Sequence, residues 1–231
     1  MRIRIINPNT TAAMTETIAN AAREAAAPGT ETEAVTSTAG PASIEGYYDE
    51  AMCLPGLLKE IDRGEAEGAG AHVIACFDDT GLDAARQLAT APVIGIGEAA
   101  YHAATLIAHR FTVVTTLSRS IPALEHNLLR YGFERRARVR AAEVPVLALE
   151  DETSDARARI DAEIARALAE DRAEAIVLGC AGMAKLARDL AARHGCPVID
   201  GVGAAVKLAE MLVALGLRTS KRGGYEAPPP K

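Results

Sequence analysis

Hydrophobic residues along this chain alternate between two spacings. Short apolar runs rich in β-branched residues favour strands, and they are separated by longer Ala-rich stretches with the apolar spacing of one helix face. We expect strands at residues 2–7, 32–36, 71–75, 93–96, 111–116, 138–148, 174–179 and 197–200. Repeated βα units of this kind are typical of an α/β fold with mainly parallel sheets.

One helix and two irregular segments stand out from this pattern. Residues 153–170 carry apolar side chains at helical spacing with charges opposite, so we expect a helix with one buried face. Residues 37–48 (STAGPASIEGYY) break both periodicities, which indicates a long loop with the length to act as a lid. The C-terminal residues 223–231 (GGYEAPPPK) are so rich in Pro and Gly that we expect them to hang free.

The second half of the chain repeats the pattern of the first. Three strand-and-turn units recur in the same order, at offsets of 108 from Arg2 to Arg110, 104 from Cys76 to Cys180 and 105 from Pro92 to Pro197. Ala-rich helices resemble one another by chance, so the ordered recurrence of strands and turns carries more weight. It predicts two similar Rossmann-like lobes related by a pseudo-twofold axis, each of about 100 residues.

Composition narrows the classes of function. The 231 residues are 49% hydrophobic, enough to form a core in one large domain or two small lobes. The net charge of −6 is spread without the basic stripe of a nucleic-acid binder. No apolar run reaches the roughly 20 residues of a membrane span, and no secretory signal begins the chain. We expect a cytoplasmic homo-oligomer with a small-molecule substrate and no nucleic-acid or membrane partner.

Two of the four cysteines occupy equivalent places in the repeat. Cys76 and Cys180 each follow an apolar strand and precede small turn-forming residues and a helix. Ligands bind at the carboxyl ends of parallel strands, and the positive end of a helix dipole lowers the pKa of a nearby thiol. Cys53 and Cys196 lie in an apolar helical pattern and before a strand proline, so we expect both to be structural. The cysteine spacing does not predict a metal site.

Two thiols on opposite sides of one cleft suit racemisation. One thiolate removes a proton from a carbon beside a carbonyl, and a thiol returns a proton to the opposite face. No cofactor is required where backbone N–H groups bind the enolate oxygen. The alternative is that both are buried structural residues, which is common for free cysteines. Their repeated position before polar or Gly-containing turns favours catalysis.

Several turns are candidates to contact the substrate. One turn follows the first strand, and a second follows the equivalent strand in the second half. Two more turns begin at the two cysteines, and the tyrosine-containing loop is the fifth segment. The candidate substrate-binding residues are Pro8, Asn9, Tyr47, Phe77, Asp78, Thr80, Thr115, Thr116, Ala181, Gly182 and Met183.

The sequence resembles a known family through a set of motifs. These are INPNTT at 6–11, SIEGYYDEA at 43–51, HVIACFDDTGLDAAR at 72–86, PVIGIGEAA at 92–100, AIVLGCAGMA at 175–184 and PVIDGVGAAVK at 197–207. Over essentially its whole length the chain is similar to the aspartate/glutamate racemase superfamily, and within it to hydantoin and allantoin racemases.

This resemblance implies a fold and a set of roles. It implies two Rossmann-like lobes, 1–97 plus 204–231 and 98–203, with the active site in the cleft between them. It also implies that Cys76 and Cys180 are the catalytic bases, without metal, pyridoxal phosphate or nucleotide. One departure is Thr80, where many relatives place Pro.

The motifs also bear on the substrate. Amino-acid racemases of the superfamily typically read C-N-[TA] and C-T-H at their cysteines and begin with an Asp-Ser turn, whereas this chain reads CFDD, CAGM and NPN. A neutral cyclic ureide therefore fits better than a free amino acid. We expect a racemase of 5-substituted hydantoins; the alternatives are an allantoin racemase and, less favoured, an amino-acid racemase or a decarboxylase of the superfamily. A two-lobed binding module and a redox protein with a Cys76–Cys180 disulfide are the alternatives from other classes.

Overall fold

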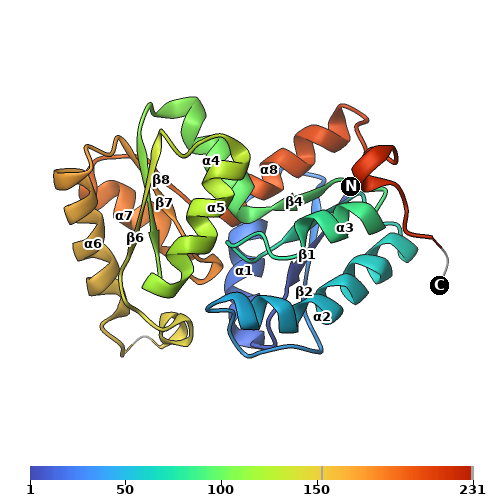
Figure 1. Cartoon of the computed structure of the whole chain (residues 1–231), viewed down its shortest axis with the longest axis horizontal. Coiled ribbons are helices and arrows are strands. Elements are labelled where there is room, and N and C mark those ends of the chain that lie inside the picture. The colour runs from blue at the N-terminus through green and yellow to red at the C-terminus, as the bar shows by residue number, and fades with distance from the viewer. Residues whose placement is uncertain (152, 230–231) are drawn as a thin grey trace.

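Two four-stranded parallel sheets lie side by side in the computed structural model, which describes residues 1–151 and 153–229 (Figure 1). Their strands are β1 (Arg2–Asn7), β2 (Glu31–Thr36), β3 (Ala71–Ile74), β4 (Val93–Gly95), β5 (Phe111–Thr115), β6 (Ala137–Ala141), β7 (Ala175–Leu178) and β8 (Val198–Ile199). The first sheet has the order β2-β1-β3-β4 and the second β6-β5-β7-β8. The predicted α/β class with parallel sheets is confirmed.

The two sheets repeat each other strand for strand. Ile3 of β1 pairs with Ala71 of β3. Phe111 of β5, 108 positions after Ile3, pairs with Ala175 of β7, 104 positions after Ala71. The β4 and β8 strands begin 105 positions apart. These offsets match those of the sequence repeat, so the predicted pair of similar lobes is confirmed.

Helices cover the sheets and connect them. They are α1 (Ala12–Ala25), α2 (Tyr47–Ala66), α3 (Leu82–Leu88), α4 (Ile96–Ile107), α5 (Ile121–Tyr131), α6 (Ala156–Glu170), α7 (Ala187–His194) and α8 (Gly201–Ala214). Short 3-10 turns are η1 (Ser118–Ser120), η2 (Val146–Glu150), η3 (Ala181–Leu186) and η4 (Gly223–Tyr225). The C-terminal helix α8 packs on α1, β3 and β4, so the chain returns to the first sheet (Figure 1).

We call the first sheet with α1, α2, α3 and α8 the first lobe, and the second sheet with α5, α6 and α7 the second lobe. The α4 helix lies between the lobes, because it contacts α8 and β4 on one side and α5 and β7 on the other. The domain limits of 1–97 plus 204–231 and 98–203 stay a prediction.

One strand of the second lobe is shorter than expected. The strand predicted at 138–148 ends at Ala141. Glu143 has a positive φ of 56°, and Pro145 has no N–H to donate, so neither residue continues a strand ladder. The chain turns into η2 instead. The helix predicted at 153–170 is confirmed as α6, which begins at Ala156.

Two segments expected to be irregular are partly ordered. The loop predicted at 37–48 ends at Gly46, because Tyr47 and Tyr48 already form the first turn of α2. The tail predicted to hang free starts with η4, which packs on α3, and the Tyr225 hydroxyl donates to Asp83 at 2.9 Å. The prediction was wrong for this part of the tail. Residues 230–231 lie outside the described residues.

The two lobes share one hydrophobic core. It joins residues of both sheets, such as Val73 and Val177, through the fully buried Tyr101 of α4. The Tyr101 ring stacks on Phe111 at 6.2 Å between centroids and meets Phe77 edge-on at 5.4 Å. Burial of this apolar surface holds the lobes against each other. Over the described part of the chain, no helix has the length and apolar character needed to cross a membrane.

A charged cluster is buried between β1 and α2. The Arg4 side chain is fully buried, and its guanidinium donates to Glu60 at 2.6 Å, to Glu67 at 2.9 Å and to Glu33 at 3.0 Å. Glu60 is itself only 5% exposed. A buried charge that loses its partner is costly, so the pair fixes how α2 lies on the first sheet.

We expect Glu60→Ala to lower the free energy of unfolding by about 3 kcal/mol, because it strips the buried Arg4 guanidinium of its most buried partner. Urea unfolding followed by circular dichroism measures the change. Asp62→Ala is the matched control, since Asp62 lies on the same helix but is exposed. Equal stabilities for the two variants would contradict the assigned role of the cluster.

Candidate active site

Cys76 and Cys180 line one small cavity between the lobes, with a volume of about 30 Å³. Its other lining residues are Pro8, Asn9, Met14, Ile44, Ala75, Phe77, Asp78, Thr115, Thr116, Ser120, Val146, Gly179 and Ala181. Most follow the carboxyl ends of β1, β3, β5 and β7, the two central strands of each sheet. This is the edge at which parallel sheets bind ligands.

The two cysteines have matching surroundings. Each lies two positions beyond the end of its strand, β3 for Cys76 and β7 for Cys180. The N–H of the residue three positions further on, Asp79 or Met183, donates to the cysteine carbonyl at 3.1 Å in each case. The Cys76 Sγ also lies 3.5 Å from the Thr80 hydroxyl. The repeat has therefore placed two similar thiol sites, one from each lobe, in the lining of the same cavity.

Burial raises the pKa of both thiols. The pKa of Cys76 lies well above its usual value because the thiol is desolvated, and the charge of Asp78 adds to the effect. Desolvation raises the pKa of Cys180 to about 12, which outweighs the Gly182 hydrogen bond. The expectation that a helix dipole lowers both values was wrong. The α3 helix starts only at Leu82, and a 3-10 turn follows Cys180, so neither thiol lies at the N-terminus of an α-helix.

The structure brings seven of the predicted substrate-binding residues to the cavity: Pro8, Asn9, Phe77, Asp78, Thr115, Thr116 and Ala181. Four others do not line it. Tyr47 is 60% exposed at the start of α2. Thr80 contacts the Cys76 sulfur through its hydroxyl. The fully buried Met183 donates its N–H to the Cys180 carbonyl, and the backbone of Gly182 lowers the pKa of the Cys180 thiol.

Sequence reasoning missed six lining residues: Met14, Ile44, Ala75, Ser120, Val146 and Gly179. Two signals were available. Met14 lies one helical turn after the INPNTT turn, and Gly179 and Ala75 directly precede the two cysteines. Val146 was hidden by the overlong strand prediction.

The Asn9 side chain forms hydrogen bonds within the turn between β1 and α1. Its Oδ1 accepts hydrogen bonds from Asn7 Nδ2 and from the Thr11 N–H, both at 2.9 Å. Its Nδ2 donates to the Met14 sulfur at 3.1 Å. These contacts fix the turn between β1 and α1, so Asn9 presents a rigid amide edge to the cavity.

The loop of residues 37–46 reaches from the first lobe to the second. One Glu45 carboxylate oxygen accepts from Arg119 at 2.5 Å, and the other accepts the Val146 N–H at 3.0 Å. The neighbouring Ile44 lines the cavity. The loop therefore forms part of the cavity wall and is bonded to the second lobe.

The described lining has one carboxyl group and no basic side chain. Asp78 is the ionisable carboxyl of the lining, and burial raises its pKa to about 7, with further contributions from Glu50 and Asp79. None of the described lining residues is Lys, Arg or His. Within residues 1–151 and 153–229, no group of three or more His, Cys, Asp and Glu side chains is placed to hold a metal ion.

Comparison with known proteins gives consistent matches. A hydantoin racemase from Rhizobium meliloti is 52% identical over 229 residues, which cover 99% of this chain and 95% of that protein. A hydantoin racemase from Pseudomonas sp. (strain NS671) is 47% identical over 100% of this chain and 93% of its own length. The solved structure of an allantoin racemase from Klebsiella pneumoniae has a TM-score of 0.98 at 53% identity, covering 100% of this chain and 95% of that one.

The family match extends from β1 into α8. The sequence profile described as Asp/Glu/Hydantoin racemase matches residues 3–209, which include both thiol sites and both sheets. The resemblance seen in the motifs is thus confirmed. The chain belongs to the Asp/Glu/Hydantoin racemase family.

Proposed function

We propose that this chain is a racemase of 5-substituted hydantoins, with Cys76 and Cys180 as its two acid–base groups and no cofactor. One observation carries the proposal: the two thiols belong to different lobes and line the same cavity. Full-length relatives named as hydantoin racemases support the substrate class. Allantoin racemase is the second candidate, supported by the structural match at 53% identity.

The proposed mechanism requires the two thiols to face C5 of the ring from opposite sides. One thiolate takes the proton from C5 of the ring, forming an S–H bond while the C5–H electron pair moves into an enolate. The thiol on the other wall then gives its proton to the opposite face, and the electron pair returns to form the new C5–H bond. The two thiols exchange roles when the reaction runs in reverse. Backbone N–H groups at the strand ends are suited to bind the enolate oxygen.

The charge of the cavity favours a neutral ring. A free amino acid would place its carboxylate beside Asp78 in a lining without a described cation, which is unfavourable in a desolvated site. A cyclic ureide has carbonyl and N–H groups that need hydrogen bonds rather than a counter-ion. A decarboxylase needs a proton donor on one face only, which leaves the second thiol without a role.

We expect the purified protein alone to abolish the circular dichroism of an enantiopure 5-substituted hydantoin. The same assay with enantiopure allantoin separates the two candidate substrates. Dialysis against a chelator should leave the rate unchanged. Full retention of optical activity for both ring types after long incubation would refute the ureide assignment.

We expect Cys76→Ser and Cys180→Ser each to reduce racemisation by at least about 100-fold, because inversion needs a competent acid and a competent base on opposite faces. Polarimetric initial rates measure the loss. Cys196→Ser is the control, since Cys196 does not line the cavity. If both cavity variants racemise at the original rate, the two-base mechanism is wrong.

We expect kcat/KM to rise about tenfold per pH unit from about pH 7 to about pH 9. The reason is that only a thiolate acts as base, and burial raises the pKa of both thiols, so the thiolate fraction is small at neutral pH and grows as pH rises. Initial rates, corrected for racemisation without enzyme, measure the profile. A flat profile over this range would mean that a thiolate already exists in the free protein.

A further inference from the structure

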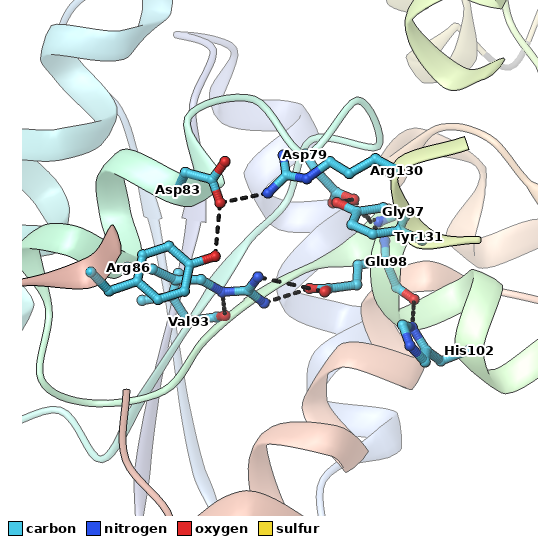
Figure 2. A network of polar contacts seen from close by, with 10 residues as sticks. Asp79, Asp83, Arg86, Val93, Gly97, Glu98, His102, Arg130 and Tyr131 are labelled. Atoms are coloured by element: carbon cyan, nitrogen blue, oxygen red, sulfur yellow. Dashed lines mark hydrogen bonds and ion pairs between the residues drawn. The ribbon is translucent and has the colours of Figure 1, made fainter. Parts of the chain in front are cut away.

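The turn that carries Cys76 is held by a helix of the opposite lobe. The α5 helix presents Asn127 and Tyr131, four positions apart and therefore on one face, toward this turn. Asn127 Nδ2 donates to the Asp78 carbonyl at 2.8 Å. The Tyr131 hydroxyl donates to the Asp79 carboxylate at 2.9 Å (Figure 2). Two consecutive residues of the Cys76 turn are thus bonded to the second lobe.

Asp79 is the anchor of this turn. It is 5% exposed and has a positive φ of 53°, a conformation that persists only where the surroundings impose it. Besides Tyr131, its carboxylate accepts the N–H groups of Gly97 at 2.9 Å and Glu98 at 2.7 Å (Figure 2). A side chain at Gly97 would collide with the Phe77 carbonyl, so α4 also packs tightly against the turn.

We propose that Tyr131 and Asn127 are positioning residues that hold the Cys76 thiol at its working distance and orientation relative to Cys180. This inference rests on the two-cysteine mechanism proposed above. Both α5 and Cys180 belong to the second lobe, whereas Cys76 belongs to the first. A contact from α5 to the Cys76 turn therefore fixes one thiol relative to the other across the cavity.

The contact acts on one thiol only. Within the described residues, neither Asn127 nor Tyr131 donates a side-chain hydrogen bond to the turn of residues 180–183. Residues 181–183 belong to η3, which packs on α1 and α8. Misplacement of a reacting group by about 1 Å can cost on the order of 100-fold in rate. Weakening the α5 contact should therefore slow proton transfer at Cys76 and spare Cys180.

A matched contact lies one turn away. The Tyr225 hydroxyl also donates to an aspartate, Asp83, at 2.9 Å, but Asp83 lies on α3 beyond the Cys76 turn. Arg130 of α5 bonds the same carboxylate (Figure 2). Tyr225→Phe removes one tyrosine–aspartate hydrogen bond from the same region without touching the proposed positioning contacts. It is the control for Tyr131→Phe, which keeps the ring that packs beside Tyr101.

The test isolates each thiol in turn. Cys180→Ser leaves Cys76 to exchange the C5 proton of one hydantoin enantiomer with deuterium oxide, and Cys76→Ser leaves Cys180 to exchange that of the other. Proton NMR measures the exchange rate. We expect Tyr131→Phe to slow exchange about tenfold or more in the Cys180→Ser protein and to leave it within about twofold in the Cys76→Ser protein. Asn127→Ala should give the same one-sided loss, and Tyr225→Phe should give none.

Equal losses in both backgrounds would overturn the proposal, because they would indicate a general loss of structure. No loss in either background would overturn it as well. If neither parent protein exchanges deuterium, the two-cysteine mechanism fails separately. The positioning of Cys76 is then judged by mass spectrometry of its alkylation by iodoacetamide, and a rate that Tyr131→Phe leaves unchanged overturns the proposal.

Discussion

The proposed reaction requires two sulfur atoms that face one carbon from opposite sides, and the duplicated sheets bring one cysteine from each lobe to the same cavity. The strand registers are the same in both halves, so β3 and β7 end at equivalent points and deliver Cys76 and Cys180 to one cavity. The shared core around Tyr101 keeps the two sheets against each other. Without that core, each thiol would still lie at the end of a strand but would lack a fixed partner.

Desolvation gives this arrangement its chemical character. Burial at the cavity raises the pKa of both thiols and of Asp78. A thiol with a raised pKa is a stronger base once it is ionised, which suits removal of a proton from a weakly acidic carbon. Glu45 bonds the loop of residues 37–46 to Arg119 and Val146 of the second lobe, beside the cavity.

The parallel sheets, the internal repeat and the equivalent positions of Cys76 and Cys180 could be predicted from the sequence. Strand periodicity and the residues at strand ends are local signals. The strand predicted to run to residue 148 failed because Glu143 adopts a positive φ, which the sequence does not show, and because Pro145, a visible signal against a strand, was passed over. The direction of the thiol pKa shifts was missed because the burial of each thiol depends on apolar side chains from several elements, such as Leu57 beside Cys76 and Leu149 beside Cys180. The contact of Tyr131 with Asp79 joins residues 52 positions apart and has no sequence signature.

The central claim is that two different groups handle the proton on the two faces of the substrate. It is tested most directly by the unmodified protein in deuterium oxide, with one protiated hydantoin enantiomer and analysis at low conversion. The account predicts that the newly formed enantiomer carries deuterium at C5 while the recovered starting enantiomer retains its proton. Deuterium appearing at equal rates in both enantiomers would show that a single base serves both faces, and would contradict the account.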